Sequence, residues 1–86
     1  MKIAKTKAFV KNYHRLPKNI QNKTDKQIIF LSKNLRHSSI RAKKLGGFSD
    51  VWEGRVDRSY RFTFIIETNT ITLLQVGHHD EGLGKK

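Results

Sequence analysis

The chain contains no cysteine and only one proline, and no apolar run approaches the length of a membrane-spanning segment. Without cysteine, neither a disulfide framework nor a thiolate metal site can supplement the core, and nothing indicates an oxidising compartment. The first five residues are too few and too charged to be the apolar part of a signal peptide. We therefore expect a cytoplasmic protein, without membrane contact, that is stabilised by packing alone.

The length of the chain limits its architecture. Eighty-six residues bury only one modest apolar core, so we expect a single domain over residues 1–86. Residues 81–86 resemble a frayed terminus, and we expect them to form a flexible tail.

Acidic residues are scarce, and the resulting net charge of +11 is unevenly distributed. Residues 1–44 contain thirteen Lys or Arg and one acidic residue, Asp25, whereas residues 45–86 contain five basic and six acidic residues. Such an excess concentrates polyanions near the surface, which favours nucleic acid or an acidic protein as the partner. A merely solubilising surface is the alternative reading of the same charge.

Apolar periodicity predicts two helices after a short strand in the first five residues. Thr6 suits the N-cap of a first helix, whose apolar residues recur at spacings of four and three: Phe9, Tyr13 and Leu16. Pro17 ends that helix and suits the first turn of a second one, which runs to about Asn34. The predicted buried stripe of the second helix is Ile20, Thr24, Ile28, Leu31 and Leu35.

Beyond Ile40 the pattern becomes that of strands. A Lys-rich segment precedes a turn at Gly46–Gly47, and residues 51–57 and 60–67 then alternate between apolar and polar. The segments 57–59 and 68–70 are short enough to connect antiparallel hairpins. The apolar side of this sheet needs a cover, which the helices supply. We predict an α+β fold in which a short N-terminal strand and a helical hairpin pack on one face of a small, mainly antiparallel, twisted sheet.

The same alternation collects polar side chains on the other face of the sheet. The expected members are Glu53, Arg55, Arg61, Thr63 and Gln75, with Lys43 and Lys44 just before them. An antiparallel sheet often exposes one polar face to water, so a solvent face and a catalytic face are both compatible with the pattern. Trp52 and Tyr60 can stack on RNA bases, but both fall on the apolar stripe, which favours core packing.

Three segments of the chain resemble the sheet of the RelE/ParE toxin superfamily: W-E-G-R-V at 52–56, Y-R-F-T-F at 60–64 and V-G-H-H-D at 76–80. The order of elements is similar over nearly the whole chain. The resemblance implies a RelE-like fold and, in the ribonuclease branch, an endoribonuclease toxin that cleaves messenger RNA in the ribosomal A site. It also implies inhibition of translation, neutralisation by a cognate antitoxin, no metal or other cofactor, and a monomer or an antitoxin-bound hetero-oligomer.

The resemblance implies roles for particular residues. Arg61 matches a core Arg of the superfamily, and with Arg55 it would stabilise negative charge on the phosphate. His79 matches the position beside the scissile phosphate and is the candidate general acid, because an imidazole exchanges a proton near neutral pH. Glu53 is the candidate base. The residues expected to bind RNA are Lys43, Lys44, Arg55 and His78.

The two histidines have other interpretations. Neighbouring residues of a strand point to opposite faces, so His78 and His79 are poor ligands for one metal ion, and we expect no metal site. A His at a strand end is also often a structural hydrogen-bonding residue. Asp80 either orients His79 or caps the end of the strand.

The C-terminal segment departs from the superfamily pattern. Many active relatives have a Tyr or Phe a few residues beyond the catalytic position, where this chain has Glu81, Gly82, Leu83 and Gly84. Either this branch works without that ring, or its activity is weak, or its target differs. A ParE-like inhibitor of DNA gyrase without nuclease chemistry, and a basic RNA-binding module, are therefore the alternatives to a nuclease toxin.

Overall fold

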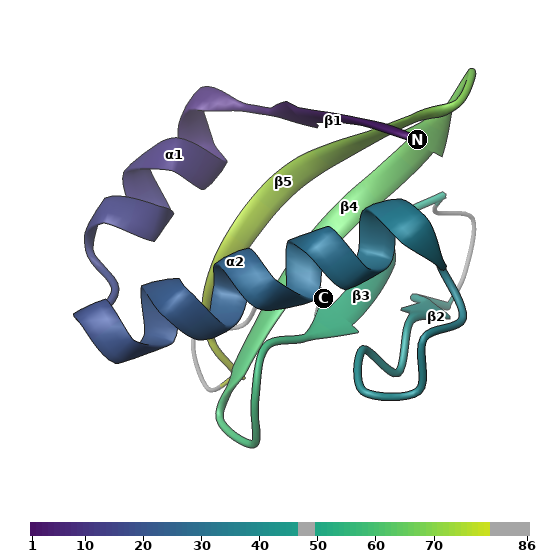
Figure 1. Cartoon of the computed structure of the whole chain (residues 1–86). Coiled ribbons are helices and arrows are strands. Elements are labelled where there is room, and N and C mark those ends of the chain that lie inside the picture. Colours follow the sequence, from purple (N-terminus) through teal and green to yellow (C-terminus); the bar gives the residue numbers. More distant parts are fainter. Residues whose placement is uncertain (47–49, 80–86) are drawn as a thin grey trace.

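The computed structural model describes residues 1–46 and 50–79 of the chain. Its elements, in chain order, are β1 (Lys2–Lys5), α1 (Lys7–His14), α2 (Lys18–Lys33), β2 (Lys43–Lys44), β3 (Trp52–Arg55), β4 (Tyr60–Glu67) and β5 (Thr70–His78) (Figure 1). The expectations for Asp80, for the tail at 81–86, for the missing aromatic at 81–84 and for part of the Gly46–Gly47 turn concern positions outside the described residues.

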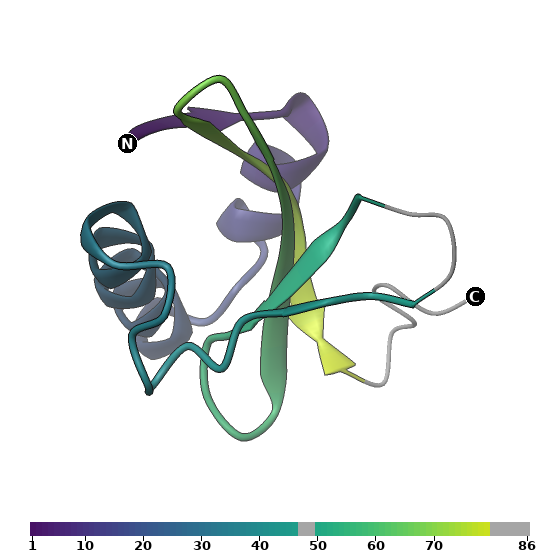
Figure 2. The ribbon, with the colours of Figure 1, turned by 90° about the vertical axis from the view of Figure 1, so that its right-hand side faces the viewer.

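The five strands form one mixed sheet in the order β1-β5-β4-β3-β2. β1 pairs with β5 in parallel, and the other three pairings are antiparallel. Both helices lie on the same face of the sheet, which leaves its other face open (Figures 1 and 2). The predicted α+β fold, with a helical hairpin on a mainly antiparallel sheet, is confirmed.

Local signals set the ends of the two helices. The Thr6 hydroxyl oxygen accepts a hydrogen bond from the Phe9 N–H at 3.1 Å, which caps α1 as predicted. Pro17 occupies the N-cap position of α2. The buried residues of α2 include Ile20, Thr24 and Leu31, but Gln27 takes the place predicted for Ile28. Gln27 tolerates burial because backbone carbonyl groups accept both of its amide hydrogen bonds.

The connection between β4 and β5 is a tight hairpin. Thr68 and Asn69 have φ angles of 44° and 60°, the left-handed conformation that a two-residue turn between twisted strands requires. Asn adopts this conformation readily, whereas the β-branched Thr68 rarely does. The turn therefore fixes the register in which Glu67 pairs with Thr70.

An irregularity in the β4–β5 pairing reverses the alternation of β5. Phe62 pairs with Val76 and Phe64 with Leu73, so Leu74 is an extra residue between the two pairs. Val76 is 3% exposed and Leu73 is fully buried. Without this bulge, Leu73 and Val76 would point to opposite faces of the sheet, and one of the two would leave the core.

The core lies between the helices and the covered face of the sheet. Its fully buried side chains include Phe62, Phe64 and Ile40. Gly54 lies beside them, where an added Cβ would come within 2.5 Å of the Phe62 ring and 3.1 Å of Ile40. Only glycine fits at this point of β3, because any side chain would overlap the aromatic ring.

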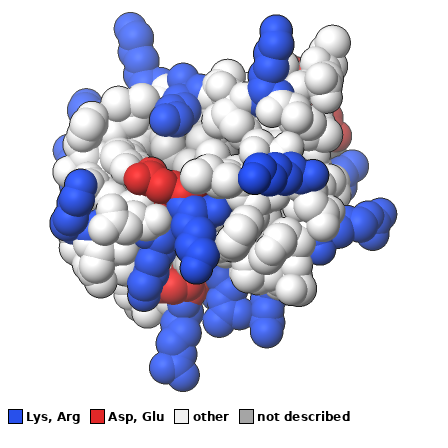
Figure 3. All heavy atoms as spheres, viewed as in Figure 1, with Lys and Arg blue, Asp and Glu red and all other residues white. Residues whose placement is uncertain are grey.

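Positive charge covers the surface of the helical layer. Figure 3 shows Lys and Arg side chains spread over this face, with few acidic groups between them. Among the described residues the one ion pair joins Lys23 to Asp57 at 3.3 Å. Neither helix in the described ranges is long and apolar enough to cross a membrane.

Candidate active site on the open face of the sheet

Strand register brings the predicted site residues of β2, β3 and β4 together on the open face. Lys43 pairs with Glu53, and Arg55 pairs with Arg61. Residues that are directly opposite in an antiparallel pair project from the same face of the sheet. Because Trp52 and Gly54 alternate with these positions and face the helices, the polar partners project away from the core.

These side chains line a pocket of about 260 Å³. Its lining residues are Arg41, Lys43, Glu53, Gly54, Arg55 and Arg61. The lining thus has four cationic side chains and one carboxylate, and Glu53 forms no ion pair within the described part of the chain. A concave surface with such an excess of positive charge attracts a phosphodiester, and it leaves one carboxylate to accept a proton.

The Arg61 guanidinium is held by the turn between β3 and β4. Its Nη1 donates to the carbonyl oxygens of Asp57 at 2.7 Å, Tyr60 at 3.1 Å and Arg58 at 3.3 Å. Nε and Nη2 make no hydrogen bond to the described residues. The guanidinium is therefore oriented through one nitrogen, and two others can bind phosphate oxygens.

Asp57 makes that turn rigid. Its Oδ1 accepts the N–H groups of Ser59 at 2.9 Å and Tyr60 at 3.0 Å, and its Oδ2 pairs with Lys23 of α2. Partial burial acts to raise the pKa of the carboxyl, but the two N–H groups and the Lys23 ammonium outweigh it and lower the pKa. The ionised carboxylate thus ties the turn to the helical layer.

His79 lies on the other side of the same turn. Its backbone N–H donates to the Ser59 carbonyl at 2.8 Å, and its Nδ1 is 3.1 Å from the same oxygen. A carbonyl oxygen only accepts, so Nδ1 of His79 is the donor in this contact. Arg61 and His79 therefore bind adjacent carbonyls of one turn, although His79 does not line the 260 Å³ pocket.

The two histidines do not point to opposite faces. Their rings stack with centroids 4.8 Å apart and an interplanar angle of 26°. His78 also contacts Tyr60 edge to face at 5.3 Å. The expectation of opposite faces was wrong because β5 ends at His78, so the strict alternation of a strand does not extend to His79.

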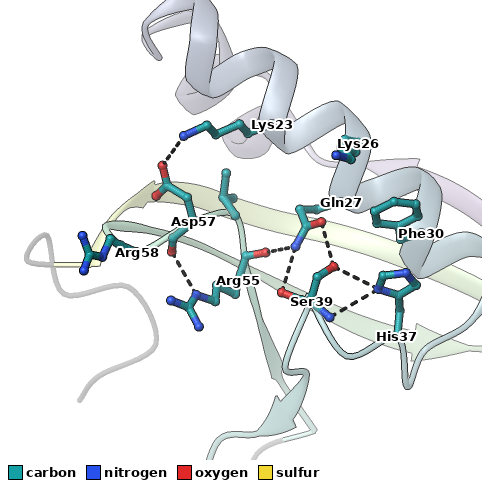
Figure 4. Close-up of a pocket in the computed structure, with 10 residues that line it drawn as sticks. Lys23, Lys26, Gln27, Phe30, His37, Ser39, Arg55, Asp57 and Arg58 are labelled. Atoms are coloured by element: carbon teal, nitrogen blue, oxygen red, sulfur yellow. Dashed lines mark hydrogen bonds and ion pairs between the residues drawn. The ribbon is translucent and has the colours of Figure 1, made fainter.

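A hydrogen-bond network around the buried Gln27 connects α2 to the strand that carries Arg55 (Figure 4). Gln27 donates to the carbonyls of Arg55 at 2.7 Å and Ser39 at 3.1 Å. The Ser39 hydroxyl lies 3.2 Å from the Gln27 amide oxygen and 2.9 Å from Nδ1 of His37. The His37 ring stacks on Phe30 at 4.1 Å. This network fixes the segment that leads from α2 to the open-face pocket.

Sequence reasoning missed one member of the pocket, Arg41. Its φ of 50° is uncommon for a residue other than Gly, Asn or Asp. The preceding residue, Ile40, is fully buried, and its carbonyl accepts the Arg55 N–H at 2.7 Å. A basic residue close to Lys43 is a signal in the sequence, but the backbone geometry that turns Arg41 into the pocket depends on tertiary contacts.

Lys44 and the two histidines are not part of the open-face pocket. Lys44 alternates with Lys43 on β2 and lies 5.9 Å from the centroid of the Trp52 ring. The structure therefore brings together Lys43, Glu53, Arg55 and Arg61 and places His79 beside the turn that holds Arg61.

Comparison with known proteins identifies the fold. No protein-family model matches the chain, and no curated protein matches it in sequence. Among solved structures, a YoeB/ParE toxin from Agrobacterium tumefaciens has 18% identity over 92% of this chain and 99% of its own, with a TM-score of 0.79.

Two complexes give similar results. A chain of the RelB-RelE antitoxin-toxin complex from Methanococcus jannaschii has 25% identity, covers 91% of this chain and 92% of its own, and has a TM-score of 0.71. A chain of the toxin-antitoxin complex RelBE2 from Mycobacterium tuberculosis has 23% identity, 90% and 95% coverage, and a TM-score of 0.76. The chain thus has a RelE-like toxin fold. The resemblance to the RelE/ParE superfamily is confirmed at the level of the fold.

Proposed function

We propose that this protein is the toxin of a toxin–antitoxin pair and that it cleaves messenger RNA in the ribosomal A site. The observation that carries the proposal is the open-face pocket, in which Arg41, Lys43, Arg55 and Arg61 surround the carboxylate of Glu53. A solvent face would disperse these charges in ion pairs with neighbours. Here the cations converge around a space that accommodates a phosphate.

The residues of the site match the needs of RNA cleavage without metal. The ribose 2′-hydroxyl attacks the adjacent phosphorus, and its proton passes to Glu53. Negative charge grows on the phosphate oxygens, where Nε and Nη2 of Arg61 together with Arg55 stabilise it. The His79 imidazole donates a proton to the leaving 5′ oxygen. The products are a 2′,3′-cyclic phosphate and a 5′-hydroxyl, so atoms and charges balance without a cofactor.

The RNA-binding residues have different positions relative to this chemistry. Lys43 lies in the pocket and binds the RNA backbone, and Lys44 extends the cationic surface past the β2 edge. His78 packs between Tyr60 and His79 and supports the position of the acid.

We further propose a small acidic antitoxin as the protein partner. Two of the similar structures are complexes of a toxin with its antitoxin. The excess of Lys and Arg in residues 1–44 provides the complementary charge on this chain. The antitoxin lays a helix or an extended segment across the basic surface or the sheet edge and so covers the RNA site.

The test is expression in cells, followed by mapping of messenger 5′ ends. The wild type should stop translation and cut messengers within codons, whereas Arg61→Ala and His79→Ala should relieve both effects while remaining folded. Intact messengers together with a DNA-damage response would replace the proposal with a gyrase inhibitor. Unimpaired growth together with salt-sensitive RNA retention would replace it with a binding module.

A further inference from the structure

A second pocket lies at the β2 edge of the sheet, beside the segment that follows α2. It has a volume of about 280 Å³. The half-buried Leu35, Ala42 and Trp52 give it an apolar wall, and the exposed Arg36 and Arg41 add two guanidinium groups. None of the described residues that line it is acidic. This combination suits a ligand that is flat, apolar on its faces and attached to negative charge.

Trp52 is not a fully enclosed core residue. It pairs with Phe64 across β3 and β4, and the two rings stack with centroids 6.1 Å apart and an interplanar angle of 15°. The rest of the indole lines the edge pocket, and the Lys44 ammonium lies 5.9 Å from its centroid. An aromatic ring with cations around it is the platform on which proteins stack the bases of single-stranded nucleic acid.

Arg41 joins the edge pocket to the open-face pocket, because it lines both. Its left-handed backbone, with a φ of 50°, is held on one side by the buried Ile40. Strained residues of this kind concentrate at functional sites. Lys43 and Lys44 project to the two sides of the same edge strand. Cationic groups therefore continue from the open face, around β2, to the indole.

We propose that the edge pocket is a nucleobase subsite for single-stranded RNA. A base next to the phosphate in the open-face pocket leaves the stack, turns around the β2 edge and lies against Trp52, while Arg41 binds the phosphate between them. The inference rests on the proposed function, since it takes RNA as the ligand. It supplies a stacking ring at the β2 edge of the sheet.

Trp52 is the only tryptophan of the chain, so its fluorescence reports directly on this pocket. The probe is a trinucleotide of RNA with 2′-deoxy sugars at the first and second positions, which removes the hydroxyl that would attack either phosphate, and the control is the same backbone with abasic flanking positions. The complete trinucleotide should quench Trp52 saturably and bind at least about tenfold more tightly than the abasic one. Equal quenching and equal affinity, or no quenching up to millimolar probe, would overturn the subsite.

Two variants test the residues without relying on fluorescence. In a competition assay, Trp52→Phe retains an aromatic partner for Phe64 but offers a smaller stacking surface, so the preference for the complete probe should fall several-fold. Arg36→Gln should weaken binding of both probes. The matched control is Arg15→Gln, which removes an exposed guanidinium outside the pocket and should leave the preference unchanged.

The two proposals fail in different ways. If Trp52→Phe cuts messengers in cells at the wild-type rate and positions, and the abasic probe binds equally well, the subsite is wrong and the nuclease stands. If the wild type leaves messengers intact but still binds the complete probe more tightly than the abasic one, the nuclease proposal is wrong and the subsite stands as an RNA-binding site.

Discussion

The two faces of one sheet have different roles in this protein. On the covered face, Phe62, Phe64 and Leu73 are fully buried under the helices, whereas on the open face Glu53, Arg55 and Arg61 keep partial exposure around a charged pocket. In β4, Arg61 and Phe62 are neighbouring residues that project to opposite faces. Substitutions on the covered face should therefore change stability, and those on the open face should change chemistry.

The largest expected effect is a loss of cleavage on the open face. Arg61→Lys keeps the charge but cannot hold the turn carbonyls with one nitrogen and a phosphate with two others. Cleavage of messenger on ribosomes should slow by at least about 100-fold, the usual cost of losing one stabilising donor. The urea midpoint serves as a control for folding. If the Arg61→Lys variant cleaved messenger at a rate close to that of the wild type, the proposed sharing of the guanidinium nitrogens between the turn and the phosphate would be wrong.

The next effect tests the connection between the helical layer and the open face. Gln27→Leu leaves the carbonyls of Arg55 and Ser39 without their donor, which should lower the free energy of unfolding by about 2–3 kcal/mol. Asn22→Leu, at an exposed position of the same helix, should change it by less than about 0.5 kcal/mol. If the two variants had equal unfolding curves, the hydrogen bonds of Gln27 would not contribute to stability.

A smaller effect on stability is expected from a substitution of Gly54 in β3. Gly54→Ala places a methyl group against the buried Phe62 ring and should destabilise the fold by about 1–3 kcal/mol in chemical denaturation. Gly46→Ala is the matched control, because an added Cβ there meets nothing within 4 Å. A Gly54 variant as stable as its control would mean that the ring moves aside freely.

The smallest effect is pH-dependent. The pKa of Asp57 is lowered in the folded state, so its contribution is present at neutral pH and is lost as the pH falls through that pKa. Asp57→Asn should therefore cost about 1 kcal/mol of unfolding free energy at pH 7 and much less at an acidic pH below the lowered pKa of the carboxyl. Denaturation curves at both pH values measure this. If the difference in unfolding free energy between the wild type and the variant did not change with pH, the charge of Asp57 would be irrelevant to the turn.

Much of the fold was predictable because its signals are local. Thr6, Pro17 and the Thr68–Asn69 turn act through their own backbone neighbourhood, and the alternation of β3 and β4 separates the two faces directly. The bulge in β5 was not predictable, since an extra residue in one strand is defined only by its pairing with β4.

The site was predictable in part for the same reason. Glu53, Arg55 and Arg61 were found from strand alternation and Lys43 from its place just before them, and the structure brings the four into one pocket. The strained backbone of Arg41, the burial of Gln27 and the stacking of His78 on His79 all arise from contacts between segments distant in sequence or at the end of a strand. Periodicity contains no information about such contacts.

In the nuclease that we propose, the position of cationic side chains on the open face, and not the total charge, determines cleavage. The most direct test removes two charges from each face in turn and compares rates of messenger cleavage on ribosomes. Lys43→Gln with Arg55→Gln should slow cleavage by at least about 100-fold, whereas Lys18→Gln with Lys33→Gln, at exposed positions of α2, should slow it by less than about threefold. Equal losses from the two pairs would contradict the account.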